Sequence, residues 1–405
     1  MSNRIKILSG MSDSVGEVNT RLRNAVESMG LILEEQDYMS IETPILEETE
    51  LFVRKSGGYM NSMLYSFVDA DGKQVSLRPE FTPSIIRYFI QERNSVILPA
   101  RWWYSGPVFR YDQDGTVGCR QFTQLGAELL GINGTAADLE IIELAIGTLK
   151  SIGIDNFQLK IGHIGVLNNL LNSFGLSEAA RLFILANIRS LKMDTANSDL
   201  LTARAADLGI VGEITGSETS SIISEMPREV AQTLVQELLS ESLQSPLGQR
   251  TAEQIVDRLL RKLAETDHPD VFSNAVRVTK EMVSIDDRPE NVLKQSEKIV
   301  ASCDASDDCL RELGNLADRL IDLLGDNVIL DLGHVRGIAY YTGMNFDISI
   351  CNGSNRVRKL GGGGRYDGLV RVLGGEENMP AAGFAYSLEQ IMDCSNSDVY
   401  QPKAP

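Results

Sequence analysis

Apolar and polar residues alternate in two different ways along the chain, and the change marks its organisation. Residues 15–29 repeat apolar positions with helical spacing. The segment SMLYSFVDADGKQVSLRPE alternates like two strands, and Asp71-Gly72 supplies the turn between them. Thr82-Pro83 then provides an N-cap and a first residue for a second helix. We therefore expect antiparallel strands packed with helices in this part of the chain.

Two longer strand-like runs, RWWYSGPVFRY and CRQFTQLGAELLG, flank the polar residues 112–118 and predict a long hairpin followed by a helix over 136–150. From about residue 166 to 325, Leu, Ala, Glu, Lys and Arg recur with helical spacing and aromatic residues are few. Strand-like runs return after that region. Strands on both sides of a helical insertion, with little strand–helix alternation, indicate an α+β fold in which helices flank an antiparallel sheet.

The same pattern predicts the domain boundaries. We expect residues 1–165 to form the first part of a core, 166–325 a helical insertion domain, 326–395 the second part of the core, and 396–405 a tail.

The charge balance bears on possible partners. The 405 residues include 38 Lys or Arg and 56 Asp or Glu, so the formal net charge is −18 and a tRNA partner is disfavoured. The five cysteines lack framework spacing and the N-terminus lacks the apolar core of a signal peptide, which predicts a reducing, cytoplasmic location. No apolar run reaches the roughly 18 residues of a membrane span. We expect no membrane partner.

The sequence spacing also argues against a bound metal. Cys303 and Cys309 have no CxxC partner, and the chain contains only three histidines. We expect neither a metal site nor a cofactor.

Three polar residues in LRPEFT have the spacing of one strand face. Arg78, Glu80 and Thr82 occupy alternate positions, so an extended strand would point all three the same way. Glu80 and the Thr82 hydroxyl could then hold a ligand ammonium. The alternative is an exposed strand end with ion pairs and a helix cap.

A second group combines both signs of charge on apolar strands. Gln124 and Glu128 in QLGAE share one strand face, and a carboxylate on a buried strand needs a partner. Arg110 and Arg336 lie at the ends of apolar runs, where a guanidinium can bind a carboxylate through two hydrogen bonds. A zwitterionic amino acid would satisfy these groups together with Tyr341. The alternative is a purely structural set of internal ion pairs.

Four consecutive glycines, Gly361, Gly362, Gly363 and Gly364, precede Arg365 and fit neither the dinucleotide fingerprint nor the P-loop. They would let the backbone approach a ligand or another strand closely. A plain turn is the alternative.

These segments together resemble a known family. RWWYSGPVFRY followed by RQFTQLGAE resembles motif 2 of class II aminoacyl-tRNA synthetases, GFAYSLEQI resembles motif 3, and TPILEE resembles the dimer-forming motif 1. HVRGIAYYTGMNF and GGGGRYDG resemble the two histidine-specific motifs of histidyl-tRNA synthetases. The resemblance covers residues 10–161 and 329–392 in the family order. It implies the antiparallel sheet of a class II synthetase catalytic domain.

Carried over by position, the resemblance implies a histidine pocket. Three residues match those that hold the α-amino group, two match those that read the imidazole, and Arg336 and Arg110 match the arginines on the carboxylate and α-phosphate side. The implied histidine-binding residues are Glu80, Thr82, Arg110, Gln124, Glu128, Arg336, Tyr340 and Tyr341. Ala339 departs from the aspartate usual in RGLDYY.

The nucleotide side departs further from the family. The synthetase loop FRHERP reads FRYDQDG here, so Asp112 replaces the acidic residue and Gln113 the arginine. Gln390 stands where motif 3 normally carries the arginine that contacts ATP. Each lost cation typically costs on the order of 10² to 10³ in rate. The sequence ends at Pro405, so we also expect no anticodon-binding domain.

A synthetase paralogue with a histidine pocket but without ATP and tRNA functions is similar to the ATP phosphoribosyltransferase regulatory subunit. That resemblance implies a non-catalytic homodimer within a hetero-octamer. Its partners would be L-histidine, as feedback inhibitor, and the short-form catalytic phosphoribosyltransferase of the first step of histidine biosynthesis. One alternative is a histidine–tRNA ligase lacking its anticodon-binding domain, in which Arg365 or a residue of the insertion replaces the missing cation. Another is an amino-acid-binding module with a different partner.

Overall fold

The computed structural model describes residues 5–54, 62–111, 119–212, 267–334, 341–351 and 357–395. The chain forms two compact units. The first comprises Met1–Gly165, Asp286–Lys294 and Asp308–Pro405, and the second comprises Val166–Ile285 and Gln295–Asp307. Among the described helices, none combines the length and the apolar character needed to cross a membrane.

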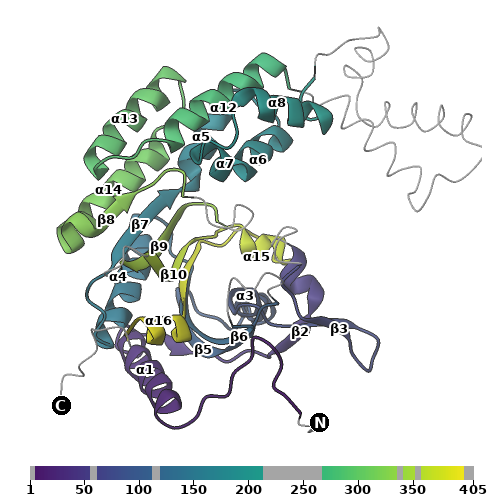
Figure 1. Ribbon diagram of the computed structural model, residues 1–405, viewed down its shortest axis with the longest axis vertical. Coiled ribbons are helices and arrows are strands. Elements are labelled where there is room, and N and C mark those ends of the chain that lie inside the picture. The colour runs from purple at the N-terminus through teal and green to yellow at the C-terminus, as the bar shows by residue number, and fades with distance from the viewer. Residues whose placement is uncertain are drawn as a thin grey trace, which may run out of the picture. The chain divides into compact units, whose positions relative to one another are not determined.

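A large sheet forms the centre of the first unit (Figure 1). Its described strands follow the spatial order β1 (Met39–Ser40), β5 (Ala100–Phe109), β6 (Gln121–Leu130), β11 (Ala381–Ser387), β10 (Val357–Arg365), β9 (Met344–Cys351), β7 (Gln158–His163) and β8 (Val328–Leu330). The inner pairs are antiparallel and only the outer pairs β1/β5 and β7/β8 are parallel. Together with the helices packed on it, this sheet confirms the predicted α+β class.

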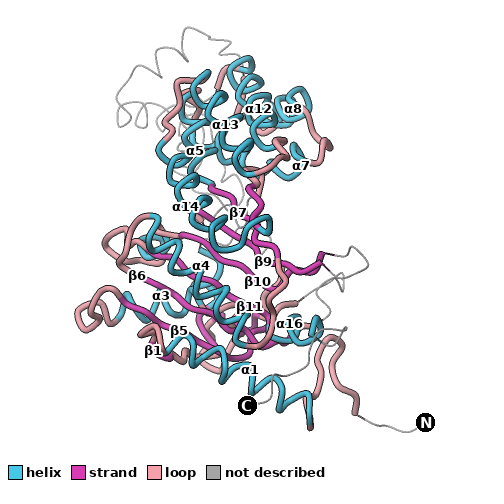
Figure 2. The backbone as a smooth tube through the Cα atoms, turned by 90° about the vertical axis from the view of Figure 1, so that its left-hand side faces the viewer, coloured by secondary structure: helices cyan, strands magenta, loops and turns pink. Residues whose placement is uncertain are grey.

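One face of the sheet is apolar and covered by helices. The helices α1 (Glu17–Glu34) and α4 (Thr135–Ser151) pack against each other and on the strands (Figure 2). Tyr386 of β11 donates its hydroxyl to the carbonyl of Ala145 in α4 at 2.6 Å. Every second residue of each strand faces these helices. The alternate residues are therefore left for the opposite face.

The opposite face carries the helix α3 (Thr82–Gln91) at its β5 side. Phe81 and Phe89 are fully buried there with Trp102 and Tyr104 of β5. Two shorter helices complete this unit's C-terminal part: α15 (Leu369–Val372), which packs on α3, and α16 (Leu388–Ser395), which follows β11 directly.

The predicted hairpin is present as a small separate sheet with the order β2 (Leu46–Glu48), β4 (Gln74–Leu77) and β3 (Ser66–Val68). The Asp69 carboxylate accepts hydrogen bonds from the backbone N–H groups of Asp71 and Lys73, both at 2.9 Å. Gly72 has a φ of 80°, which a residue with a side chain rarely adopts. The sequence therefore predicted this turn for the correct physical reason.

The described part of the second unit is helical. It contains most of α5 (Ile164–Ser173), α6 (Glu178–Ala186), α7 (Ile188–Lys192), α8 (Ser198–Asp207), α12 (Pro269–Val283) and residues 295–302 of α13 (Pro289–Ser302). Side-chain caps begin three of these helices: Ser177 accepts from the Ala180 N–H, Asn197 from the Leu200 N–H, and His268 from the Asp270 N–H.

The helix α14 (Asp308–Leu324) belongs to the first unit, although its sequence suggested the insertion. Its apolar stripe includes Leu313, Leu316 and Leu320, and it packs on α4, β7 and β8. Helical spacing shows that a helix has an apolar face but not which core that face covers. The 3₁₀ turn η1 (Gly325–Asn327) then leads into β8.

Candidate functional site

A buried carboxylate lies over a row of glycines on the sheet face opposite α4. Glu128 of β6 is paired with Gly383 of β11, and Gly383 is paired with Gly364 of β10. Directly opposed residues on neighbouring strands point to the same face. A Cβ atom on Gly383 would overlap Oε2 of Glu128, so glycine at this position makes room for the carboxylate.

Three hydroxyl groups hold the Glu128 carboxylate, which is only 1 % exposed. Thr82 donates to Oε1 at 2.5 Å, Tyr104 donates to Oε1 at 3.3 Å, and Tyr366 donates to Oε2. Burial raises the pKa of Glu128 to about 8, and these hydrogen bonds oppose the rise only in part. The group is therefore mostly protonated at neutral pH. A cationic ligand would favour its ionised form.

Tyr104 reaches Glu128 because another glycine leaves room for its side chain. A Cβ on Gly126 would lie 2.5 Å from the Tyr104 hydroxyl oxygen and would close this path. The Tyr104 ring stacks on Phe81, with ring centroids 4.4 Å apart. Burial, reinforced by the neighbouring Glu128, raises the pKa of Tyr104 well above its ordinary value, so it remains a hydrogen-bond donor.

Residues 78–82 are fixed beside the carboxylate by two arginines and an amide. Arg78, which is 2 % exposed, donates to the carbonyls of Pro107 at 2.9 Å and Thr43 at 2.6 Å. Its pKa is lowered to about 10 by burial, so it keeps its charge at neutral pH. Nε of Arg110 donates to the Pro79 carbonyl at 2.9 Å.

Gln124 contributes to the same region through its side-chain oxygen. Oε1 of Gln124 accepts a hydrogen bond from the Phe81 N–H at 3.1 Å. This contact holds the start of α3 against β6. Part of the amide's hydrogen-bonding capacity is thus used within the protein.

The prediction that LRPEFT is an extended strand with Arg78, Glu80 and Thr82 on one face is wrong. The strand β4 ends at Leu77, and Thr82 is the first residue of α3 with Phe81 as its N-cap. The Thr82 hydroxyl bonds Glu128 and makes no cap. Glu80 is half-buried and close enough to Glu128 to contribute to its raised pKa. Helix geometry therefore brings Thr82 to the carboxylate, where strand alternation was expected to do so.

The structure places the other predicted site residues as follows. Gln124 and Glu128 share the site face of β6, and the Tyr341 ring lies against Gly364, where a Cβ would come within 2.7 Å of two ring atoms. Arg336, Tyr340, Asp112 and Gln113 lie outside the described residues, as does Ala339.

Sequence reasoning missed two residues of the site, Tyr104 and Tyr366. Both lie inside segments that were recognised from the sequence, RWWYSGPVFRY and GGGGRYDG. Their hydroxyls meet Glu128 only because β5, β6 and β10 come together in the sheet. No local spacing indicates that meeting.

The glycine run forms part of β10 and not a turn. Its alternate residues face different sides of the sheet. A Cβ on Gly361 or Gly363 would collide with Tyr386 or with the β11 backbone, whereas Gly362 and Gly364 are paired with Ala385 and Gly383 on the site side. Ligand approach was expected at all four glycines; Gly361 and Gly363 serve strand packing instead.

Arg365 is tied to the helix-covered face. Its guanidinium donates to Asp138 of α4 at 2.8 Å, to Asp367 at 3.1 Å, and to the carbonyls of Ile132 and Gly134. Burial raises the pKa of Asp138 to about 6, and the Arg365 charge opposes this rise. The arginine links the end of β10 to α4, and these bonds hold it away from the site face.

On α16, a neutral amide stands where the resemblance implies an arginine. Gln390 is exposed on α16. Its neighbour Glu389 accepts from the Thr123 N–H at 2.8 Å and from the Thr123 hydroxyl at 2.9 Å. Arg110 and Arg120 lie side by side at the end of the β5–β6 hairpin, with the Arg110 N–H bonded to the Arg120 carbonyl at 2.9 Å.

We predict that Gly383→Ala destabilises the protein and damages the site, because the new methyl group must displace Glu128. Overpacking of this kind costs typically about 1–3 kcal/mol in the free energy of unfolding. Gly147→Ala is the matched control. Its Cβ would meet only Ile32 at 3.6 Å, so in α4 it should stabilise by up to about 1 kcal/mol. Urea unfolding measures both, and equal effects of the two variants would contradict the packing argument.

We also predict that Glu128 lowers the free energy of unfolding as the pH rises. Its folded pKa of about 8 exceeds the ordinary value of 4.5, so the folded state binds more protons between these pH values. Stability from this group therefore falls as pH rises from about 5 to 8. Glu128→Gln should remove that fall, so the variant gains stability relative to the wild type with increasing pH. Parallel curves of unfolding free energy against pH would exclude the raised pKa.

The chain resembles known proteins over most of its length. A sequence model described as histidyl-tRNA synthetase matches residues 10–211 and 227–391. The histidine–tRNA ligase of Sulfurisphaera tokodaii is 28% identical over 384 residues, covering 94% of this chain and 73% of the relative. That of Methanocaldococcus jannaschii is 29% identical over 383 residues, covering 95% and 74%.

Solved structures show the same fold. A Bacillus halodurans protein described as an ATP phosphoribosyltransferase regulatory subunit/histidyl-tRNA synthetase has a TM-score of 0.65 at 22% identity, covering 97% of this chain and 84% of that one. The histidyl-tRNA synthetase of Nostoc has a TM-score of 0.63 at 16% identity, covering 99% and 77%. The match over most of its length shows that the chain belongs to the histidyl-tRNA synthetase family.

Proposed function

We propose that this chain is a non-catalytic regulatory subunit of ATP phosphoribosyltransferase that binds L-histidine at the Glu128 site. The observation that carries the proposal is Gln390, a neutral amide where the family pattern places the motif 3 arginine. Glu128 meanwhile accepts hydrogen bonds from Thr82, Tyr104 and Tyr366. The Bacillus halodurans neighbour, whose description includes this regulatory role, supports the same direction.

The pocket has the chemistry that a histidine ligand needs. Among the described residues, three hydroxyl groups donate to the buried Glu128 carboxylate, and burial keeps its pKa high. The ammonium and imidazole N–H groups of histidine would bring positive charge and donors to this carboxylate. Binding would therefore relieve the electrostatic cost of burying it. Thr82 and Gln124, already fixed beside Glu128, need little rearrangement.

Adenylation of histidine requires a different set of groups. Negative charge develops on phosphate in that transition state, and fixed cations stabilise it. Gln390 supplies none, and Arg365 is committed to Asp138 and Asp367 on the helix side of the sheet. Arg365 therefore does not compensate for the missing arginine. The site favours binding over catalysis.

Regulation requires that occupancy of this site changes the catalytic partner. Histidine must bind one state of the assembly more tightly than another, typically by about 1–3 kcal/mol. The partner would be the short-form catalytic phosphoribosyltransferase, joined by homodimers of this chain in a hetero-octamer. The net charge of −18 agrees with a protein partner better than with tRNA.

A second candidate is a histidine–tRNA ligase. The ligases of Sulfurisphaera tokodaii and Methanocaldococcus jannaschii align with over nine-tenths of this chain. Arg110 and Arg120 at the end of the β5–β6 hairpin also retain positive charge on the motif 2 side. These two guanidiniums favour residual nucleotide binding.

One pair of measurements separates the two candidates. We expect calorimetry to show histidine binding by the purified chain, with histidine-dependent ATP–pyrophosphate exchange at background. Glu128→Ala should abolish binding and leave the fold intact by circular dichroism. Glu143→Gln, an exposed carboxylate on α4, is the control and should bind normally. Exchange well above background would establish the ligase instead, and absence of histidine binding would reject the pocket.

The regulatory role has its own test. Mixed with a short-form catalytic phosphoribosyltransferase, the wild-type chain should make phosphoribosyl transfer sensitive to histidine. Glu128→Ala should support the same activity without histidine inhibition, because it removes the sensor and not the assembly. Equal inhibition with both chains would place the feedback site elsewhere.

A further inference from the structure

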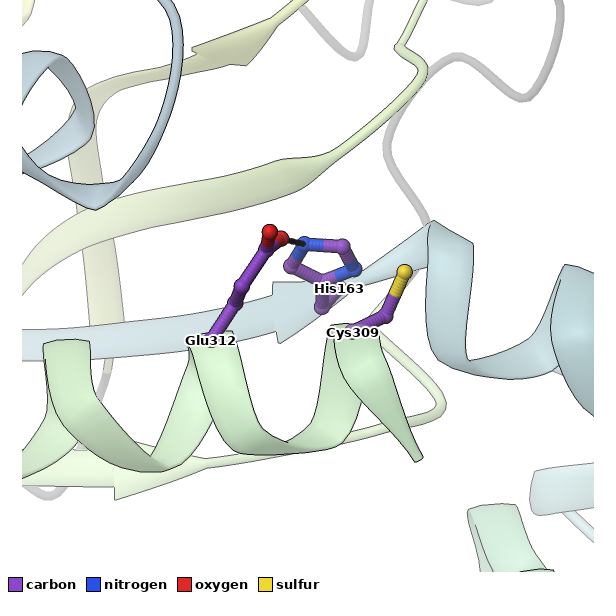
Figure 3. A group of neighbouring side chains, drawn as sticks. All are labelled: His163, Cys309 and Glu312. Carbon is purple, nitrogen blue, oxygen red and sulfur yellow. Dashed lines mark ion pairs between the residues drawn. The ribbon is translucent and has the colours of Figure 1, made fainter. Parts of the chain in front are cut away.

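Three side chains with metal-ligand chemistry meet on the helix-covered face of the sheet, away from Glu128. His163 is the last residue of β7, and Cys309 and Glu312 lie near the start of α14, three residues apart on one side of that helix. Figure 3 shows the imidazole between the Cys309 sulfur and the Glu312 carboxylate. One donor atom from each residue lies within 4.8 Å of the other two.

The contacts of His163 leave one nitrogen of its buried imidazole without a partner. The side chain is 6% exposed, and its Nδ1 has no hydrogen-bond partner. Nε2 lies 3.9 Å from Oε2 of Glu312, which is too long for a hydrogen bond. Burial, with a contribution from the Arg365 charge, lowers the pKa of His163 to about 4, so a true ion pair does not form at neutral pH. A buried polar group in this state is costly and calls for a ligand.

A glycine lets two of these donors pack against the backbone. A Cβ on Gly165 would lie 2.7 Å from the Cys309 sulfur and 3.0 Å from Nδ1 of His163. A side chain at this position would therefore push the sulfur and the imidazole from their present places. Cys309 lies at the N-terminal end of α14.

We propose that His163, Cys309 and Glu312 bind a thiophilic divalent metal ion, with Zn²⁺ the best match. Imidazole, thiolate and carboxylate are all zinc ligands, and three protein ligands leave a fourth position for water. The thiolate selects against Mg²⁺ and Ca²⁺, which prefer oxygen ligands. Tetrahedral zinc places its donors about 3.3–3.8 Å apart. The three side chains must therefore close by about 1 Å, which the 57% exposed Glu312 side chain permits.

The ion would join two places where the chain leaves and re-enters the first unit. His163 precedes Val166, the first residue of the second unit, and Cys309 follows Asp307, its last. Metal binding would tie the end of β7 to the start of α14 within the first unit and stabilise the folded chain. Sequence spacing hides this group because its histidine and cysteine lie far apart in the chain. The proposal does not depend on histidine binding.

Co²⁺ titration of the full, chelator-treated chain tests the site. We expect a thiolate-to-cobalt charge-transfer band and strong visible bands of four-coordinate cobalt, saturating at one ion per chain and displaced by Zn²⁺. Zn²⁺ should also raise the midpoint of thermal unfolding. Cys309→Ser should lose the charge-transfer band, whereas Cys303→Ser, the matched cysteine control, should keep it.

Two further variants retain the cysteine and guard against misfolding. Glu312→Gln removes an exposed ligand, and Gly165→Ala places a methyl group against the Cys309 sulfur. Each should weaken Co²⁺ binding about tenfold or more, the range seen when metal sites lose supporting groups. A wild-type chain without the thiolate band would overturn the proposal. So would a band that survives Cys309→Ser or disappears equally in Cys303→Ser.

Discussion

The first unit is built around a carboxylic acid buried in a β-sheet. Glu128 is 1 % exposed on a central strand, and burial there disfavours its charge. Its neighbours follow from that constraint. Glycines at 383 and 126 provide the space, and hydroxyls of Thr82, Tyr104 and Tyr366 provide the hydrogen bonds. Residues from four separate segments therefore meet at Glu128, because its buried carboxyl group needs space and hydrogen-bond donors.

Strand alternation separates recognition from stability in this sheet. Residues on the α4 side close the core, as the Arg365–Asp138 pair and the Tyr386 bond to Ala145 show. On the other side, glycines of β10 and β11 and the polar residues Gln124 and Glu128 form the site, and apolar residues of β5 pack against α3. A one-residue change of register in β10 would exchange these roles, placing Arg365 in the site and Gly364 in the core. The bonds of Arg365 to α4 help to specify the register.

Local patterns predicted what depends on local geometry. The turn at Gly72, the shared face of Gln124 and Glu128, and the antiparallel sheet follow from short-range periods and backbone preferences. Three other features depend on strand order. They are the contacts of Tyr104 and Tyr366, the place of α14 in the first unit, and the orientation of alternate glycines toward opposite faces of the sheet. Strand order is set by pairing between segments that lie far apart in the chain. No short stretch of the sequence shows which distant segment it will pair with.

In this fold, the groups suited to binding an amino acid differ from the groups suited to catalysing its adenylation. A ligase could therefore lose its catalytic groups, keep its binding groups and become a sensor. On the proposed function, the groups around Glu128 act on the ground state of a bound amino acid. A motif 3 arginine would act mainly on charge that develops during adenylation, and only such transition-state interactions raise the rate of the chemical step. On the proposed function, the amide of Gln390 would lower the rate of adenylation and leave the contacts of Thr82, Gln124 and Glu128 unchanged. On the proposed function, selection for feedback needs only the first set of groups.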